Sequence, residues 1–559
     1  MNKVKYMRFR MFHFIIGFTL MLLMLPSCKK EIIDDEKITN EPDKEVEDEK
    51  PVVLPENTSE LWTEFLLYKE NGTESRLADF SYAGYRFGEY DIPNVDYPVF
   101  DVSEYGAIAN DGLSDRKAFE DAIAAAQKKG KGIIYFPAGR FDLRPQDAPN
   151  KSITIDGDNL VLRGAGSGEG GTELYMEYPN QPETDGALWS CPPLVLFRYN
   201  FDNDKQWSVD ENFSDRKLAD INTDAARGTF TVEVSTTSGL HIGKRVFLNL
   251  KNNDPSFIAE ELYPYEVDSE WTDILNNGIQ VTEYNEIARI EGNKVTFKAP
   301  LLYKIEAKRK WTLHEHSCNI GVGVEDIAFV GNFQDEFVHH KDATHDSGFK
   351  LLGLLRQTNA WVRRCRFTNV SEALSVQKSA NVSVFDCKIT GNQGHSAIRS
   401  EASTRVFIGR IDDQPAQYHS TGVSKTSIGT VLWRNTTASN SCFESHSYQP
   451  RVTLLDACEG AFLSDHAGGD QASAPNHLGE LVLWNYNNIM SGNTFDFWSR
   501  NNRFLKPILV GFHGQPITFE QSQVAVNEKQ GTKVYPESLY EAQLIERLGY
   551  LPNWLQDLK

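Results

Sequence analysis

The chain has 559 residues, of which 78 are acidic and 57 are basic, and its formal net charge at pH 7 is -21. Nucleic acids and anionic membrane surfaces are bound through basic faces, so this acidic balance argues against both as partners. With 40 Gly, 32 Phe, 21 Tyr and a charged fraction of 24%, the composition is typical of a folded, turn-rich β protein.

Residues 1–28 have the pattern of a secretory signal. Basic residues precede the apolar run FIIGFTLMLLML, which is too short to serve as a membrane span. The following Leu25-Pro26-Ser27-Cys28 resembles a bacterial lipobox, in which the Cys is lipidated and becomes the mature N-terminus. The alternative is an ordinary signal peptide with an incidental Cys28. We expect a lipid on Cys28 to be the only contact with a membrane.

Residues 29–60 are rich in Glu, Asp, Lys and Pro and have almost no aromatic residues. Such a segment cannot bury a core, so we predict a disordered tether. Its acidic cluster EIIDDE resembles the export signal of lipoproteins displayed on the outer face of some Gram-negative outer membranes. We therefore predict an outer-membrane lipoprotein exposed at the cell surface, with a periplasm-facing orientation as the alternative.

Residues 61–100 are aromatic and Gly-rich, and we expect them to lie as a strap against the rest of the fold. An amphipathic helix is predicted next, with Ser114 or Asp115 as its N-cap and Gly130 at its end. Its apolar face comprises Ala118, Phe119, Ala122, Ile123 and Ala126. A helix of this kind ahead of a repeat array can cover the open N-terminal end of a solenoid.

The segment from about Phe100 to Met176 carries a specific resemblance. Its runs DVSEYGAIANDGLSDRKAFEDAI, GKGIIYFPAGRFDL and NLVLRGAGSGEGGTELYM closely resemble the N-terminal part of the pectate-lyase-like superfamily. That superfamily of right-handed parallel β-helices includes polysaccharide lyases, polygalacturonase-type glycosidases and phage tail-spike enzymes. The resemblance implies a polysaccharide partner, and it alone allows Ca²⁺ as a cofactor. It marks the fold rather than the reaction, because these residues cap the helix.

From about 199 to 313 the sequence predicts strands and a hairpin that turns at Glu291-Gly292-Asn293. A polar, aromatic-bearing stretch lies between the strands. This insertion is either one wall of a groove or plain packing on the flank of the main body.

Between Trp361 and Ser464 the sequence repeats itself every 22 residues. The three columns are Phe367, Ile389, Ile411, Trp433, Leu455; Val362, Val384, Val406, Ile428; and Val376, Ile398, Ser420, Cys442, Ser464. A leucine-rich repeat would need Leu at fixed positions and an Asn ladder, and a β-sandwich would not keep three columns in register. We therefore predict an all-β fold, a right-handed single-stranded parallel β-helix with capping helices at both ends.

The repeat is lost after Phe495, and the final stretch predicts a helix with Leu539, Leu544 and Leu548 on its apolar face, covering the C-terminal end of the solenoid. We expect a monomer. The predicted parts are the signal peptide 1–28, the tether 29–60, the strap 61–100, the β-helix 101–495 with its insertion at about 199–313, and the capping segment 496–559.

A β-helix has no interior cavity, so a ligand must lie across several coils on the outside. If the third column points inward, strand alternation turns Arg399, His419 and Asp465 outward, with Phe443 beside them to stack on a sugar. The predicted catalytic residues are Arg399, Glu401, His419, Glu444, His446, Asp465 and His466, and the predicted substrate-binding residues are Lys378, Phe443, Asp470 and His477. A merely solvated polar face is the alternative for each residue.

Two loops remain to be placed. The loop with His339, His340, Asp342, His345 and Asp346 has the residue types that bind zinc, but its spacing matches no familiar motif, and no metal is assigned. It is a substrate-facing loop, a metal site or an incidental polar loop. The second insertion, from His466 to His477, is expected to be a flexible, exposed rim of the substrate groove.

Three functions fit these predictions. A polysaccharide lyase would use Arg399 and Lys378 to neutralise a uronic acid carboxylate, His419 or His446 as base and His466 as acid. An inverting glycoside hydrolase would use Glu401 and Glu444, about two coils apart, and Glu444 with Asp465 on adjacent coils would suit retention instead. A non-catalytic glycan-binding lipoprotein is the third possibility. We favour cleavage of an extracellular polysaccharide by β-elimination.

Overall fold

The computed structural model describes residues 54–199, 215–463 and 468–559. Contacts divide the chain into Met1–Thr58 and Ser59–Lys559, and the second unit carries all the elements described below. The predicted signal peptide, Cys28 and most of the tether lie outside the described residues. Among the residues that are described, no helix is both long and apolar enough to cross a membrane.

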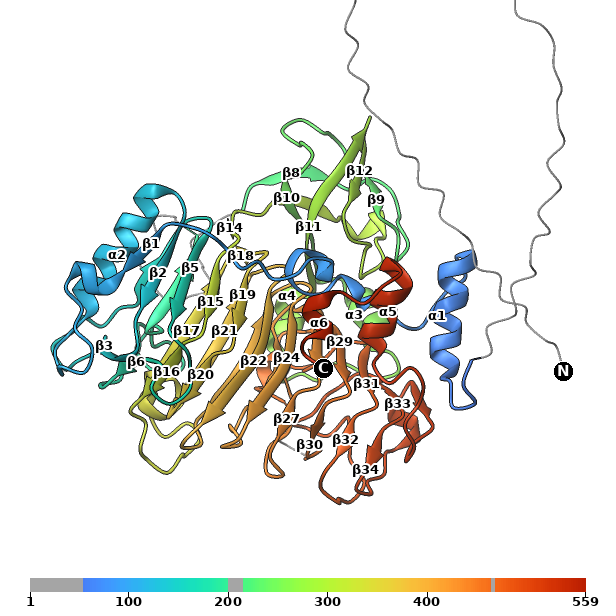
Figure 1. Cartoon of the computed structure of the whole chain (residues 1–559). Helices are drawn as coiled ribbons and strands as arrows, with labels where there is room; N and C mark the ends of the chain where they lie inside the picture. The colour runs from blue at the N-terminus through green and yellow to red at the C-terminus, as the bar shows by residue number, and fades with distance from the viewer. Residues whose placement is uncertain (1–53, 200–214, 464–467) are drawn as a thin grey trace, which may run out of the picture. The chain divides into compact units, whose positions relative to one another are not determined.

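The second unit is built around a right-handed parallel β-helix (Figure 1). Equivalent strands of successive coils pair in parallel and form three long sheets. The first sheet contains β1 (Val99–Asp101), β2 (Gly132–Phe136), β5 (Leu160–Gly164), β15 (Gly323–Glu325), β19 (Trp361–Arg363), β22 (Ser383–Thr390), β24 (Phe407–Asp413), β26 (Ile428–Trp433), β29 (Arg451–Asp456), β31 (Leu481–Trp484), β33 (Ile508–Val510) and β35 (Val526–Glu528).

The other two sheets complete each coil. The second sheet shares β22 and β24 and adds β3 (Gly139–Asp142), β6 (Thr172–Met176), β16 (Ala328–Gly331), β20 (Arg366–Thr368), β27 (Thr436–Thr437), β30 (Glu459–Gly460), β32 (Asn487–Asn488) and β34 (His513–Gly514). The third sheet contains β4 (Ile153–Ile155), β7 (Val195–Arg198), β17 (Lys350–Leu355), β21 (Glu372–Gln377), β23 (Ser396–Glu401), β25 (Gly422–Ser424) and β28 (Glu444–His446). A short parallel pair, β14 (Asn319–Ile320) and β18 (Gln357–Thr358), lies at a turn.

The repeat holds its predicted length only over the first coils. Val362 pairs with Val384 and Phe367 with Ile389, at 22 residues, but Val376 pairs with Ser400, two residues beyond the predicted Ile398. The added residues are accommodated between strands. This shift is an even number and keeps the predicted sides, but Arg399 then pairs with Gly422 at 23 residues, and that odd step reverses the predicted sides from there on.

The parallel ladder also continues beyond 495. Strands β33 and β35 extend the first sheet, and β34 extends the second, so the predicted end of the β-helix is wrong by about one and a half coils. These strands have only two or three residues each, which is too few to show a periodicity in the sequence.

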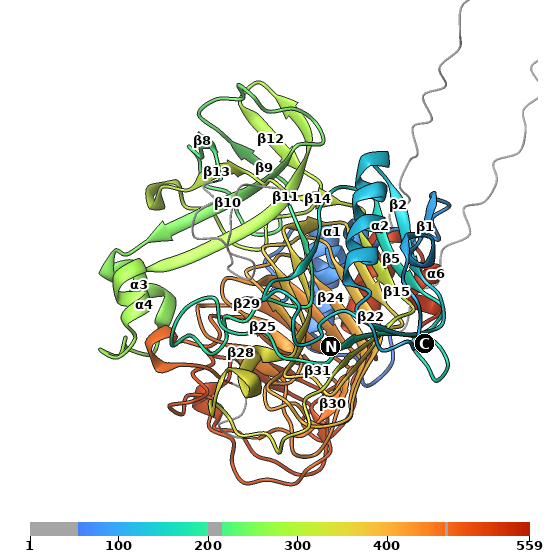
Figure 2. The ribbon, with the colours of Figure 1, turned by 90° about the vertical axis from the view of Figure 1, so that its left-hand side faces the viewer.

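The insertion forms a separate antiparallel sheet that stands out from the side of the solenoid (Figure 2). Its strands, in the order β8, β13, β10, β11, β12, β9, are Lys217–Asp220, Thr312–Glu315, Arg245–Asn252, Ile279–Glu291, Lys294–Phe297 and Thr231–Glu233. Glu291 faces Lys294 across the hairpin, as the sequence predicts. The helices α3 (Pro255–Leu262) and α4 (Thr272–Asn277) connect β10 to β11.

The helix α2 (Arg116–Lys129) covers the N-terminal coil. All five residues of its predicted apolar face are buried, and the ring of Phe119 meets that of Phe136 edge-on at 4.9 Å. Asp115 is the N-cap and Gly130 ends the helix at φ 79°, where a residue with a side chain would be strained. The apolar core of the solenoid begins under this helix.

The N- and C-terminal segments lie together over the outer face of the first sheet. They comprise α1 (Glu60–Asn71), the 3-10 turns Phe80–Tyr82 and Tyr85–Gly88, α5 (Leu539–Leu548) and α6 (Asn553–Gln556). The ring of Tyr540 packs on Phe407 of β24, and Glu541 bonds Trp433 of β26. The helix α5 thus covers the flank of the middle coils rather than the last coil.

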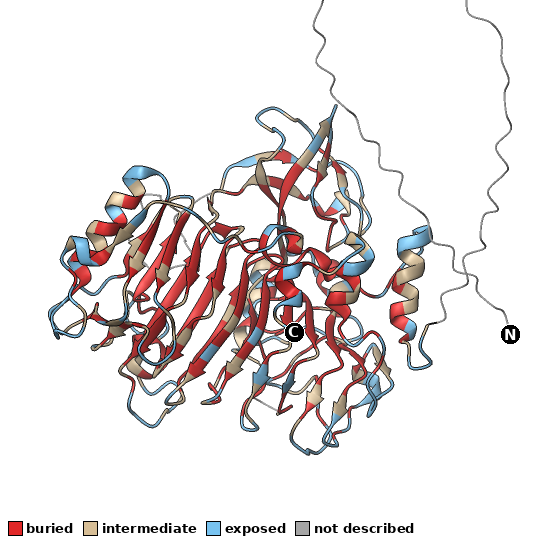
Figure 3. Ribbon diagram, viewed as in Figure 1, coloured by how far each residue is buried: buried red, intermediate tan, exposed pale blue. Residues whose placement is uncertain are grey.

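The described residues form two large hydrophobic cores. One fills the interior of the solenoid, and the other lies between the first sheet's outer face, the terminal segments and the insertion. Figure 3 shows the consequence: the strands are buried along most of their length, and exposed residues gather in the turns. Short turns of helix lie at Val102–Tyr105, Ala307–Arg309, Thr344–Gly348, Gln471–Ser473 and Gln521–Gln523.

Candidate functional site

Polar residues gather on the outer face of the third sheet. Val376 and Ile398 are buried in the core, so the residues beside them on β21 and β23 face outward. The register aligns Leu196, Gly353, Ser375, Arg399, Gly422 and Glu444 in one row across six strands. At about 4.8 Å between strands, this row is about 24 Å long.

Glu444 is the centre of the candidate site. Its side chain is fully buried, and its Oε2 accepts a hydrogen bond of 2.9 Å from Nη2 of Arg399. Its Oε1 lies 2.7 Å from Nδ1 of His419 and 3.9 Å from Nε2 of His446. The contact with His419 lies off the axis of a hydrogen bond, so Oε1 and Nδ1 are both buried without a hydrogen-bond partner.

Gly422 permits this arrangement. A Cβ at position 422 would collide with the main chain of Glu444, so the close approach of β25 and β28 depends on glycine. His419 lies just before β25 and is bridged to Ser396 at the start of β23. The imidazole, the carboxylate and the guanidinium therefore come from three successive coils.

Two further ion pairs flank the centre on the same face. Nζ of Lys425 lies 2.7 Å from Oε2 of Glu401, and Nζ of Lys350 lies 2.8 Å from Oε2 of Glu372. Burial works to raise the pKa of Glu401, but the charges of Lys425 and Arg399 hold that pKa below its usual value. At Glu372 burial is likewise outweighed, by the charge of Lys350 and by the neighbouring side chain of His395, and the pKa of Glu372 is lowered to about 2.

The histidines of the site are held neutral. Burial lowers the pKa of His419 well below its usual value, and the neighbouring His395 and Arg399 lower it further. Burial likewise lowers the pKa of His446, and it lowers that of His339 to about 4. A neutral imidazole can accept a proton or bind a metal ion.

The loop between β16 and β17 folds over this face. The ring of His339 stacks on Tyr418 at 4.1 Å and lies 5.3 Å from the ring of His419. His345 is fully buried, and its Nδ1 accepts a hydrogen bond from the main chain of Val338. His345 therefore organises the loop, whereas His339 faces the candidate site.

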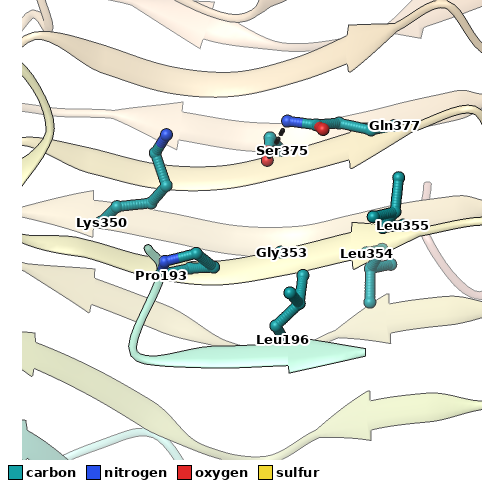
Figure 4. A pocket seen from close by; sticks show the side chains of 8 residues that line it. All are labelled: Pro193, Leu196, Lys350, Gly353, Leu354, Leu355, Ser375 and Gln377. Carbon is teal, nitrogen blue, oxygen red and sulfur yellow. Dashed lines mark hydrogen bonds between the residues drawn. The ribbon is translucent and has the colours of Figure 1, made fainter. Parts of the chain in front are cut away.

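A shallow depression continues the row on the N-terminal side. It is lined by Pro193, Leu196, Lys350, Gly353, Leu354, Leu355, Ser375 and Gln377. Figure 4 shows Lys350 on the left and the hydrogen-bonded Ser375 and Gln377 to its right. Because residue 353 is glycine, its place in the row is left without a side chain. The depression therefore extends the surface on which a chain-like ligand can lie.

The structure brings five of the predicted catalytic residues to one face: Arg399, Glu401, His419, Glu444 and His446. Asp465 and His466 lie outside the described residues. Lys378 is half-buried in the turn after β21, and its N–H donates to the carbonyl of Glu401.

Phe443 is not on the outer face. It is 5% exposed and packs in the core against Phe462 and Phe504, so the prediction that it stacks on a sugar is wrong. The coil from Arg399 to Gly422 has 23 residues instead of 22, so the outward row reaches Glu444 and leaves Phe443 on the inward side.

The second insertion is only partly the exposed rim that was predicted. Asp470 is exposed, but residues 473–477 are buried. Inside the fold, Nε2 of His477 forms a hydrogen bond of 3.0 Å with Oγ1 of Thr453. His477 therefore cannot bind substrate from this loop. Gly469 does lie against the site, because a Cβ there would collide with the ring of His446 and with Ser447.

Several residues of the site were missed. His395 is not among the residues predicted from the sequence. Tyr418, Glu372 and Lys350 were not singled out. The register aligns Lys350 and Glu372 with Ser396 and His419, but strand alternation from the inward Leu352 and Val376 would have turned both inward, so the sequence pattern could not have found them.

The site does not fit Ca²⁺. That ion needs six to eight oxygen ligands, but Glu372, Glu401 and Glu444 are each paired with a Lys or Arg. Across the described ranges, the groups that could hold a metal are His339, His340 and His395, and His419, Glu444 and His446. Both are dominated by imidazole, which suits transition metals.

Comparison with known proteins gives local matches. A family model described as "Domain of unknown function (DUF4955)" matches residues 416–558, which include His419, Glu444 and His446. Mannuronan C5-epimerase AlgE3 of Azotobacter vinelandii is 36% identical over 84 residues, 15% of this chain and 5% of that protein. Alginate lyase 7 of the same organism is 33% identical over 70 residues, 12% of this chain and 8% of that protein. The chain thus spans less than a tenth of either relative.

Solved structures match over more of the chain at low identity. The match to the tailspike protein gp49 from Pseudomonas phage LKA1 covers 78% of this chain and 79% of the tailspike chain at 11% identity, with a TM-score of 0.41. The A-module of Mannuronan C-5 epimerase AlgE4 from Azotobacter vinelandii covers 78% and 96% at 11% identity, with a TM-score of 0.36.

Proposed function

We propose that this protein is a polysaccharide-active enzyme that cleaves a uronic-acid polymer by β-elimination. One observation carries the proposal. His419 and Glu444 face each other at 2.7 Å on the outside of the solenoid, with Arg399 holding the other carboxylate oxygen. An imidazole that faces a carboxylate can act as a general base, with the hydrogen bond between them aligning when substrate binds.

The proposed step is as follows. His419 takes the proton from C5 of the uronic acid, the C4–O bond breaks, and a double bond forms between C4 and C5. The leaving oxygen takes a proton from Tyr418, whose ring lies edge-on to His419 at 4.9 Å. Arg399, the cation beside the pair, favours the charge that develops on the sugar carboxylate.

The face also suits a polymer. The row from Leu196 to Glu444 spans six strands and includes Gly353 and Gly422, which keep the surface low. Lys350 and Lys425 lie on either side of Arg399 along the face. The local similarity to proteins named for mannuronan and alginate supports a uronic-acid substrate.

C5 epimerisation is the second candidate, because several similar proteins are named as C5-epimerases. It shares the first step, removal of the C5 proton, and differs in returning a proton to the opposite face of C5. Glycoside hydrolysis is less well supported. It needs a carboxylic acid with a raised pKa, and the pKa of Glu401 is lowered instead.

The test uses the full chain and a panel of uronic-acid polymers in D₂O. Elimination gives products that absorb in the ultraviolet, whereas epimerisation gives deuterium at C5 without chain cleavage. Hydrolysis gives new reducing ends without ultraviolet absorbance, and a glycan-binding protein gives no new product at all. Deuterium at C5 without cleavage would replace elimination by epimerisation, and either of the last two results would overturn both.

The matched variants are His419→Ala and His241→Ala, the latter in an exposed turn of the insertion. Loss of a general base costs about 10²–10⁴ in rate. We expect His419→Ala to lose at least about 10²-fold in kcat, with His241→Ala unchanged. Equal activity in both variants would remove His419 from the mechanism.

We also propose that Cys28 carries a lipid that holds the enzyme at the outer membrane facing the cell exterior. The proposal rests on the lipobox-like Leu25-Pro26-Ser27-Cys28 and the acidic segment behind it. Radiolabelled palmitate should enter the wild-type protein in cells and not Cys28→Ala. Protease added to intact cells should remove the protein from the surface, and full protection would indicate a periplasm-facing anchor.

A further inference from the structure

Three histidines from two separate segments meet at the edge of the candidate site. His339 and His340 come from the loop between β16 and β17, and His395 comes from the turn that leads into β23. One ligand atom from each lies within 4.8 Å of the others. None of the three has a role in the elimination step proposed above.

Asp346 orients two of these rings. Its Oδ2 lies 2.6 Å from Nδ1 of His340, and its main-chain oxygen lies 2.9 Å from Nδ1 of His395. The carboxylate also accepts the N–H of His340, and Asp346 itself is fully buried. Histidines that bind metals are held in this way, with one ring nitrogen bonded to a carboxylate or carbonyl and the other directed at the metal.

Two of the remaining ring nitrogens lack hydrogen-bond partners. Nε2 of His395 and Nε2 of His339 are both buried and make no hydrogen bond. The His395 side chain is 8% exposed, so water does not readily satisfy it. A buried polar atom without a partner costs about 1–3 kcal/mol, and two such atoms aimed at one region indicate a missing ligand.

We propose that His339, His340 and His395 bind one divalent transition metal ion through Nε2, with Asp346 as the supporting residue. Three imidazoles and an open fourth position are the ligand set of Zn²⁺, at about 2.0–2.1 Å from each nitrogen. The ion joins the loop to the sheet, so it stabilises the fold as well as the site. This inference stands independently of the reaction proposed above.

The second histidine group is a poorer metal site. His419, Glu444 and His446 also converge, but Arg399 donates to Glu444 at 2.9 Å. That guanidinium would lie beside the dication and repel it. Around the first group the nearest charge is the carboxylate of Asp346, which favours a cation.

The experiment uses the full chain without a histidine tag, stripped with a chelator and titrated with Co²⁺ and then Zn²⁺. Wild-type protein should bind one Co²⁺ with visible absorption bands of nitrogen ligation, and Zn²⁺ should displace it. At a 100-fold excess over Kd, Zn²⁺ should raise the Tm by about 2–3 °C. Activity is not part of the readout, so failure here leaves the elimination proposal standing.

Four variants locate the ion. His340→Ala removes an exposed ligand with little risk to the fold, and it should raise the Kd for Co²⁺ at least about 100-fold, whereas Asp346→Asn should raise it about tenfold. His446→Ala and His241→Ala should bind Co²⁺ like wild type. Absence of bound Co²⁺ and Zn²⁺ in wild type would overturn the proposal. So would binding that survives His340→Ala and is lost in His446→Ala, because the ion would then lie at Glu444.

Discussion

Two buried glutamates on different faces of the solenoid differ in how they are satisfied. Glu325, on the first sheet, accepts Nε of Arg163 at 2.5 Å, Nε of Arg363 at 2.7 Å and Nε1 of Trp361 at 3.2 Å. Glu444, on the third sheet, is equally buried, but only its Oε2 is bonded, to Arg399. Both residues are 1% exposed.

The difference distinguishes a charge cluster that is satisfied within the protein from one that is not. Both oxygens of Glu325 are used by the protein itself, so nothing is left for a ligand. At Glu444 the oxygen Oε1 and the facing Nδ1 of His419 have no hydrogen-bond partner, although burying polar atoms without partners costs free energy. Such a cost is tolerated where the groups serve substrate or reaction, and perturbed groups gather at functional sites for that reason.

The largest effect should come from Glu444→Gln. Without the carboxylate, His419 loses the group that orients it and stabilises its protonated form, and kcat/KM should fall about 10³-fold or more. The cooperative unfolding transition should be retained. Activity within tenfold of wild type would show that the unsatisfied oxygen has no catalytic part.

Glu325→Gln is the matched variant on the other face, and it should affect stability instead. Removing the charge leaves the partly buried Arg163 and Arg363 without their anion, which costs about 1–3 kcal/mol in the free energy of unfolding. Urea unfolding followed by circular dichroism measures this loss. Per folded molecule, turnover should equal that of wild type, and a parallel loss of turnover would mean that the two clusters are not distinct.

Gly469→Ala should weaken the site although it replaces none of the site's polar side chains. The added Cβ would collide with His446 and Ser447, which shifts the ring of His446 away from Glu444. A misplacement of this kind should cost about tenfold in activity. Gly168→Ala is the control, because nothing lies within 4 Å of a Cβ there. Equal turnover in both variants would show that the second insertion does not support the site.

The sequence predicted the inward and outward sides well, and it predicted positions along a strand less well. The third column, which passes through Val376 and Ile398, placed Arg399 correctly on the outside, because alternation depends only on parity. It placed Phe443 wrongly, because Arg399 pairs with Gly422 at 23 residues, and this odd step moves the outward row from Phe443 to Glu444. His395 and Tyr418 could not be chosen from the sequence, since their role arises from the loop with His339 that folds back over them.

The first sheet offers a last and smaller test through Asp456. This carboxyl is buried and accepts Ser538 Oγ at 2.5 Å and the main-chain N–H groups of Leu539 at 3.0 Å and Tyr540 at 2.9 Å, so it holds the start of α5. Burial raises its pKa to about 7, above the value of about 3.9 in the unfolded chain. Between about pH 4 and pH 7, the carboxyl of Asp456 is protonated in the folded protein and ionised in the unfolded chain.

The contribution of Asp456 to stability is therefore fully present below about pH 4 and is lost as the pH rises toward 7. Relative to Asp456→Asn, which cannot titrate, the wild-type free energy of unfolding should fall by about 1 kcal/mol per pH unit between pH 5 and 7. Urea unfolding at pH 5, 6 and 7 measures that difference. If it rises instead, Asp456 is ionised in the fold, and its three donors outweigh burial.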